Sequence, residues 1–211
     1  MLKKAALIGA LLAFAFAILV TSTLKTANPA YVFSPAQLTV LDQKEATESG
    51  NMEVAYYLPH HGILPTHALW PLKAARDKGW LLLTFDTAKK TNLLLLFADK
   101  RLGMAKELFE AGKAEEGMPA AYKAEQYLEE AYTEHEKLAS TGADTTDFLT
   151  RLALASLKHQ EVLEGIFLIA PEDARPHLTE VLNKPRSVYE RAKAKLGEQN
   201  RPIPSSETSE Q

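Results

Sequence analysis

The sequence has no cysteine among its 211 residues. This absence excludes disulfide bonds, thiolate zinc sites, cysteine nucleophiles and a lipid-modified N-terminal cysteine together. The sequence also lacks the phosphate-binding pattern G-x-x-x-x-G-K-[ST], the dinucleotide-binding turn G-x-G-x-x-G and the hydrolase elbow G-x-S-x-G. Because none of these patterns is present, we expect a protein that is not an enzyme and needs no cofactor.

The body of the chain contains no block of consecutive basic residues. The 24 basic and 27 acidic residues give a formal net charge of −3. Nucleic acid requires a concentrated Lys/Arg surface, so we do not expect it as a partner. The hydrophobic fraction of 46% is sufficient for a true core, which argues against a wholly disordered chain.

The N-terminus carries the clearest targeting signal. Lys3 and Lys4 precede residues 5–24, which contain no charged side chain. A positive start followed by an apolar run is typical of a secretory signal peptide, and about 20 residues also suffice to cross a bilayer as a helix. Two export alternatives stay open for this segment: a signal peptide cleaved after Ser22, or an uncleaved membrane anchor. The remaining alternative is a buried core helix of a cytosolic protein. Either export alternative places the body outside the cytoplasm, as a secreted, periplasmic or membrane-anchored protein.

The composition divides the chain into four segments. Residues 1–24 are the signal peptide or anchor, and residues 25–55 form a tether without sustained apolar periodicity. Within the tether, Tyr31–Phe33 could form a short strand. Residues 56–197 form a helical-bundle domain, and residues 198–211 form a low-complexity tail that we expect to be disordered.

The body shows helical periodicity interrupted by proline, glycine and aspartate. We expect helices over residues 70–83, 87–112, 119–140, 145–169 and 171–196, with Asp86 capping the second and Pro185 bending the fifth. Strand signals are nearly absent. Long helices joined by short loops pack as antiparallel neighbours. The predicted fold class is therefore all-α, an antiparallel bundle of about four to five helices preceded by the N-terminal signal or anchor helix.

Two of the predicted helices carry apolar stripes that define their inward faces. In the second helix the stripe consists of Leu94, Ala98, Leu102, Ala105 and Phe109. In the fourth it consists of Phe148, Leu152, Ala155, His159, Val162, Ile166 and Ile169. The glutamates of the third helix, by contrast, are numerous enough to predict a solvated face.

His159 lies on the apolar stripe of the fourth helix, and His135 continues an apolar stripe of the third helix through Leu128 and Ala131. Counted from the turn at Gly142, they differ in height by about 15 Å at the usual helical rise, so they do not form a pair within this hairpin. The Glu-x-x-His motif of carboxylate-bridged di-iron bundles is absent from the helices. We therefore expect each histidine to bond a neighbour at the edge of the core.

A histidine-rich segment, LPHHGILPTHALWPLK, covers residues 58–73. Its histidines, His60, His61 and His67, are the candidate metal ligands of the chain. Adjacent side chains on extended backbone point to opposite sides, which disfavours joint chelation by the first two. We therefore predict exposed loop histidines and no metal site.

The same segment predicts a structural clasp over one end of the bundle. Two prolines restrict the backbone, a glycine permits a turn, and a third proline starts the first helix. We expect Ile63, Leu64, Leu69 and Trp70 to cover the bundle end. A charged triplet, Asp99-Lys100-Arg101, should pair with Lys73, Arg76 or Asp77 of the first helix. The predicted structural residues are Pro59, Gly62, Pro65, Trp70, Pro71, Lys73, Asp99 and Arg101.

Two stretches resemble an uncharacterised domain-of-unknown-function family of exported, all-helical bacterial and archaeal proteins. They are LPHHGILPTHALWPLKAARDKGWLLLT and KKTNLLLLFADKRLGMAKELFEAGKAEEGMPAAYKAEQYLEEA, and together they cover about residues 56–131. The matching positions include the Leu-Pro and Leu-Pro-x-x-x-Leu patterns around Gly62 and the Ala-Asp-Lys-Arg-Leu sequence at 98–102. The chain departs from the pattern at His60 and Trp70. The resemblance implies export and a helical fold, and it implies no particular chemistry.

Three functions are compatible with these observations. The first is a non-enzymatic helical bundle of the cell envelope with a binding or structural role, attached to the membrane if its N-terminal helix is uncleaved and contacting an envelope protein partner. The second is an extracytoplasmic sensor or regulator that acts through a membrane partner, since some members of the resembled family look like such regulators. The third is a bundle that binds a metal or haem, which would require converging histidines.

Overall fold

The computed structural model describes residues 31–33 and 54–205. The predicted signal or anchor segment lies outside these residues, as does most of the tether. Among the described residues, no helix is long and apolar enough to span a membrane. Tyr31–Phe33 do not form a strand, and no strand occurs elsewhere in the described part of the chain.

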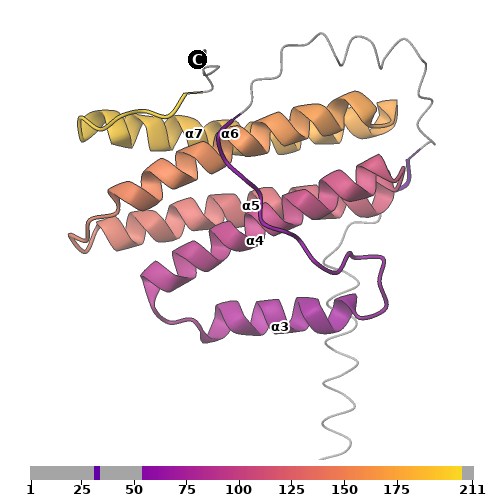
Figure 1. Cartoon of the computed structure of the whole chain (residues 1–211), viewed down its shortest axis with the longest axis horizontal. Helices are drawn as coiled ribbons and strands as arrows, with labels where there is room; N and C mark the ends of the chain where they lie inside the picture. Colours follow the sequence, from indigo (N-terminus) through magenta and orange to yellow (C-terminus); the bar gives the residue numbers. More distant parts are fainter. Residues whose placement is uncertain (1–30, 34–53, 206–211) are drawn as a thin grey trace, which may run out of the picture. The chain divides into compact units, whose positions relative to one another are not determined.

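The described chain is all-helical, as predicted. Its elements are α3 (Trp70–Leu83), α4 (Thr87–Glu110), α5 (Ala114–Ala139), α6 (Thr146–Ile169), a single 3-10 turn η1 (Glu172–Ala174) and α7 (Arg175–Glu198). Figure 1 shows α4 to α7 as two stacked hairpins, with α3 beside α4. Within the hairpins α4 packs along α5 and α6 along α7, while α4 also meets α6 and α5 meets α7. The antiparallel bundle expected from the sequence is thereby confirmed.

Most helix boundaries lie where the sequence predicts them, at capping residues and glycine turns. The Asp86 carboxylate accepts a hydrogen bond of 2.9 Å from the Lys89 amide, so it caps α4 as predicted. Gly112 and Gly142 follow α4 and α5 with φ of +70° and +84°, a conformation in which a side chain would be strained. The turns that produce the antiparallel arrangement therefore depend on these two residues.

Two predicted boundaries are wrong. The third predicted helix begins at Ala114, five residues before the expected start at Pro119, because one missing amide is tolerated near a helix start whose first turn carries Glu115 and Glu116. The fifth does not begin at Pro171. The 3-10 turn intervenes, and α7 starts at Arg175 and continues through Pro185.

The predicted stripes form the core. All five stripe residues of α4 are at most 4% exposed, and the stripe of α6 is buried except at Ile169. The largest fully buried side chains come from all four helices of the bundle: Leu94, Leu102, Met104, Leu108, Met118, Leu128, Leu149, Leu152, Leu163, Ile166, Leu178 and Leu196.

The first part of the predicted disordered tail has defined contacts. Glu198 is the last residue of α7, and the Arg201 amide donates to the Leu196 carbonyl at 3.0 Å. The Tyr189 hydroxyl donates to the Pro204 carbonyl at 2.8 Å. The expected tail boundary at residue 198 is therefore too early, and residues 206–211 lie outside the described residues.

Candidate functional site

Three ionisable side chains occupy core positions on three different helices. Asp99 of α4, Glu125 of α5 and His159 of α6 are 4%, 0% and 0% exposed. Asp99 precedes the buried Leu102 by three residues, and Glu125 precedes the buried Leu128 by the same interval. Residues three apart on a helix share a face, so the helical period turns both carboxylates toward the core.

His159 lies between the two carboxylates. Its Nδ1 is 2.8 Å from Glu125 Oε1, and its Nε2 is 3.1 Å from Asp99 Oδ1. A carboxylate oxygen can only accept a hydrogen bond, so both ring nitrogens carry hydrogen and the ring is a positively charged imidazolium. The second oxygen of Glu125 is buried and has no hydrogen-bond partner.

Tyr56 connects this group to the segment that precedes α3. Its hydroxyl donates to Asp99 Oδ2 at 2.7 Å. We call Tyr56, Asp99, Glu125 and His159 the ion cluster, and residues 54–69 the strap. The strap has a second attachment at its start, where the Val54 amide donates to Glu161 Oε2 of α6 at 2.9 Å. The cluster thus joins three helices and the strap in one network.

The cluster changes the pKa values of its members in directions that follow from this geometry. Burial alone would lower the pKa of His159, but the charge of Glu125 and the hydrogen bonds to Asp99 and Glu125 outweigh burial and raise it to about 10. Burial, and then the negative charge of Asp99, raise the pKa of the Tyr56 phenol above its ordinary value. His159 therefore stays charged, and Tyr56 stays neutral, throughout the ordinary pH range.

The residues of the ion cluster line neither of two hollows on the described surface. The larger hollow has a volume of about 520 Å³ between α4 and α6, and the smaller one has about 300 Å³ around the α5–α6 turn. Their lining includes none of the four cluster residues. A substrate or ligand in either hollow would not reach His159.

Comparison with known families adds an identification to this geometry. Residues 62–173, just over half of the chain, match the family described as Domain of unknown function (DUF5667). The chain belongs to this family. The matched span contains α3 to α6 and with them the three charged members of the ion cluster, while Tyr56 precedes it. No curated protein and no solved structure matches the chain.

The charged triplet at the centre of the DUF5667 domain behaves differently from our prediction. Asp99 was expected to pair with α3, but its carboxylate turns inward and bonds Tyr56 and His159. Arg101 does meet α3, because its guanidinium carbon lies 4.3 Å from the ring centroid of Trp70. Lys73 does not pair with the triplet as predicted, because its ammonium lies 3.7 Å from Asp77 of its own helix and 5.0 Å from the Trp70 ring centroid.

The predicted clasp is only partly realised. Gly62 has φ of +75° and forms the expected turn, and Pro71 lies in the first turn of α3 as expected. Pro59 and Pro65 are half-buried. The covering role is wrong for Ile63 and Leu69, which are 37% and 54% exposed, and Trp70 is only half-buried. The start of the strap is attached both by the hydrogen bonds of Val54 and Tyr56 and by the burial of Val54, which is 5% exposed.

The three loop histidines have three different environments. His61 Nε2 is 2.6 Å from the Glu107 carboxylate of α4, and its ring lies against Gly103, where a Cβ would be 3.3 Å away. His67 Nδ1 accepts a hydrogen bond from the Leu69 amide at 3.1 Å. His60 is exposed. The prediction of exposed histidines is therefore wrong for His61, whose side chain is 16% exposed.

In the described part of the chain, no group of three histidine, cysteine, aspartate or glutamate side chains is arranged to hold a metal ion. In the ion cluster, each ring nitrogen of His159 is bonded to a carboxylate. His135 is no partner for it, because its Nε2 bonds the Thr145 hydroxyl at 2.9 Å.

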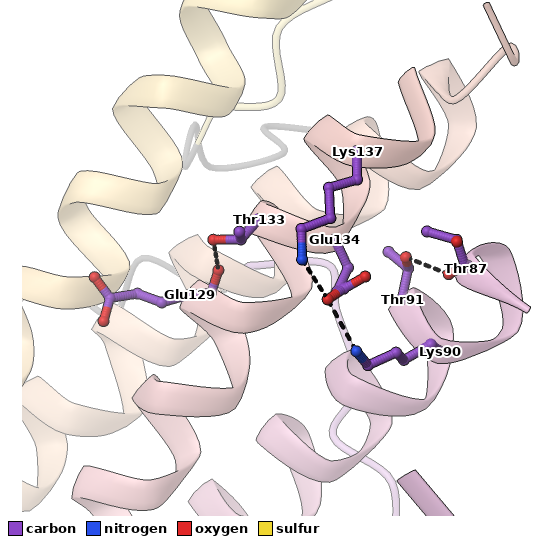
Figure 2. Close-up of polar contacts among 7 residues, drawn as sticks. All are labelled: Thr87, Lys90, Thr91, Glu129, Thr133, Glu134 and Lys137. Atoms are coloured by element: carbon purple, nitrogen blue, oxygen red, sulfur yellow. Dashed lines mark hydrogen bonds and ion pairs between the residues drawn. The ribbon is translucent and has the colours of Figure 1, made fainter. Parts of the chain in front are cut away.

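A smaller ion network joins α4 to α5 near the surface (Figure 2). Glu134 Oε1 accepts from Lys90 and Lys137, each at 2.9 Å. Burial alone would raise the pKa of Glu134, but the two lysine hydrogen bonds outweigh it and hold this pKa below its usual value. The predicted solvated glutamate face is therefore wrong at Glu134, whose side chain is 13% exposed.

Sequence reasoning missed two members of the ion cluster. Glu125 received no attention among the many glutamates of α5, and Tyr56 marked only a segment boundary. A signal was present for Glu125, which is flanked by the buried Ala121 and Leu128 on the helical period. A charged residue on an apolar stripe needs a partner of opposite charge, and His159 on the stripe of α6 was the candidate.

Proposed function

We propose that the chain is a non-enzymatic helical-bundle protein of the cell envelope, exported through its N-terminal segment, with a binding or structural role. The closure of the ion cluster carries this proposal. Its three charged members are at most 4% exposed, and each ring nitrogen of His159 is bonded to a carboxylate. A catalytic acid or base must reach its substrate, so groups enclosed in this way support a structural role.

The proposed location rests on the sequence. Lys3 and Lys4 precede the uncharged residues 5–24, a pattern typical of signal peptides and membrane anchors. An uncleaved segment would attach the protein to the membrane, and a cleaved one would release it. Its partners would then be the membrane or another protein of the envelope, and not nucleic acid.

A reporter enzyme that is active only after export tests this proposal. Fused after Leu58, it should be active in the unchanged chain. The matched control carries Leu12→Arg and Ala15→Arg, which interrupt the apolar run and should abolish the activity. Equal activity of the two fusions, or none in the unchanged chain, would overturn the proposed location.

Two further measurements refine the result. Extraction of membranes at high pH separates an uncleaved anchor, which stays in the pellet, from a cleaved protein, which washes off. Crosslinking in intact cells, followed by identification of the captured proteins, then distinguishes a regulator with a defined protein partner from a protein whose contact is the envelope itself.

A further inference from the structure

The outward face of α3 is apolar. Of the twelve exposed large hydrophobic side chains in the described residues, six lie in the short stretch from Leu69 to Phe85. Leu72, Leu82 and Leu83 are 72%, 70% and 73% exposed. The helical period places these three leucines together, on the side of α3 opposite to Asp77. The remaining members of the six are Leu69, Trp80 and Phe85, with Trp80 57% and Phe85 88% exposed.

The inward face of α3 combines a buried charge with apolar side chains, since Leu81 packs against the core and Trp70 is half-buried. Asp77 is 6% exposed and bonds Arg76 at 2.7 Å and Lys73 at 3.7 Å. A helix packed on a protein in water normally turns its apolar residues inward and its charged residues outward. The three exposed leucines on the outward face depart from this pattern, and an exposed apolar patch of this kind marks a site of contact with another apolar surface.

The charge around this face is positive in a chain that is negative overall. Residues 70–90 contain five basic side chains and two acidic ones, a formal charge of +3, while the whole chain has −3. One of the two acidic residues is the buried Asp77. Lys78 of α3 and Lys89 at the start of α4 are exposed, as is Asp86, the other acidic residue. The positive charge of this segment complements an anionic surface.

We infer that the outward face of α3, from Leu69 to Phe85, binds the surface of a bilayer that contains anionic phospholipid. Leucine and phenylalanine beside tryptophan and lysine are the composition of helices that lie in the membrane interface. No residue of α3 lines either of the hollows described above. A second copy in a symmetric pair would bring two faces of the same positive charge together, which charge repulsion disfavours.

This inference rests on the proposed location outside the cytoplasm, where a membrane is within reach. About 30 residues separate the predicted anchor from the strap, and an extended chain of that length spans up to about 100 Å. The bundle of an anchored protein could therefore stand away from the bilayer or lie against it. Binding through α3 selects the second arrangement.

The two tryptophans of the chain provide the test. Trp70→Phe leaves Trp80 as the sole tryptophan, and Trp80→Phe leaves only the half-buried Trp70. The full-length chain is added to vesicles of phosphatidylcholine with or without phosphatidylglycerol, some with brominated acyl chains that quench a tryptophan lying in the apolar region. Flotation of the vesicles reports separately whether the chain is attached to them at all.

We expect quenching of Trp80 in the anionic vesicles, clearly weaker quenching in the neutral vesicles, and little quenching of Trp70 in either. Leu82→Ser with Leu83→Ser should remove most of the Trp80 quenching. The matched control Leu168→Ser, at a 46% exposed site on α6, should leave it unchanged. Circular dichroism verifies that each variant keeps its helix content.

Several results would overturn the inference. If the chain floats with anionic vesicles but Trp80 is not quenched, the inference about α3 is overturned. The proposed attachment through the N-terminal segment would still stand. Quenching that is equal for Trp70 and Trp80 would show that binding does not occur through α3. A Trp80 emission shift without vesicles, accompanied by a doubled molecular mass, would identify a second copy as the occupant. By contrast, Trp80 quenching that persists after Leu12→Arg and Ala15→Arg would show that α3 binds the vesicles without the N-terminal segment. It would support the α3 surface whether or not the anchor proposal holds.

Discussion

Replacing His159 by leucine should destabilise the protein by roughly 3–5 kcal/mol, because it leaves two carboxylates in the core without a positive partner. Glu125 and Asp99 approach the ring at 2.8 and 3.1 Å, and His159 is 0% exposed, so solvent cannot take over its role. The matched control is His135→Leu. His135 is also buried, but its hydrogen bond is to the neutral hydroxyl of Thr145, and losing a neutral hydrogen bond costs about 0.5–1.5 kcal/mol.

The two histidines should also differ in the sign of their pH dependence. The pKa of His159 is raised from 6.5 to about 10 in the folded state. Its linked stabilisation is fully present below about pH 6.5, declines by about 1.4 kcal/mol per pH unit above that, and is lost as the pH rises through about 10. Burial lowers the pKa of His135, so its linked stabilisation is present above about pH 6.5 and is lost as the pH falls through its folded-state pKa.

Urea unfolding followed by circular dichroism, from about pH 6 to about pH 9, measures both effects. The stability difference between the unchanged protein and His159→Leu should shrink as the pH rises, while the difference for His135→Leu should not. Equal losses for the two variants, or a His159→Leu loss that is constant with pH, would refute the assignment of a buried imidazolium.

Three further predictions concern packing, surface ions and the strap. Gly117→Ala should destabilise by about 1–2 kcal/mol in urea unfolding, because its Cβ would lie 2.7 Å from a buried aromatic ring, whereas Gly165→Ala, with open space around it, should stabilise by about 0.5–1 kcal/mol. Glu134→Gln should cost about 0.5–1 kcal/mol at neutral pH, and this cost should disappear in acid once the pH falls through the lowered folded-state pKa of Glu134. Tyr56→Phe should accelerate amide hydrogen exchange in the strap, while Tyr57→Phe, at a 90% exposed site, should not.

Most of the fold could be predicted because its signals are local. Apolar spacing of three and four residues identified the inward faces of α4 and α6, and Asp86 marked the start of α4 through a cap that involves only its own turn. The start of α5 was missed because a single proline was given more weight than the acidic first turn that precedes it.

The ion cluster could not be predicted as a unit, because its members lie on four separate segments. The sequence placed His159 on an inward stripe, and it showed that Asp99 interrupts an apolar run. It did not show that α4 and α6 pack side by side, which is what brings their side chains together. Asp99 was assigned to α3 because that helix is adjacent in sequence, yet adjacency in sequence does not determine which neighbour a side chain meets.

The outward face of α3 was hidden from sequence reasoning for a related reason. Residues 70–83 were predicted only as a helix, and the position of α3 beside α4 is what shows that Leu72, Leu82 and Leu83 point away from the bundle. The same position places Asp77 inside. A helix with an exposed apolar face can be recognised only once its packing is known.

The central claim is that the enclosed cluster of the DUF5667 domain is an internal ion network, so that the protein acts through its surface. Nitrogen-15 NMR of the His159 ring tests this claim most directly. We expect the chemical shifts of a ring with hydrogen on both nitrogens at about pH 8, changing only as the pH approaches about 10. A ring that is neutral at about pH 8 would have one nitrogen free to take a proton or bind a metal ion, and it would contradict the account.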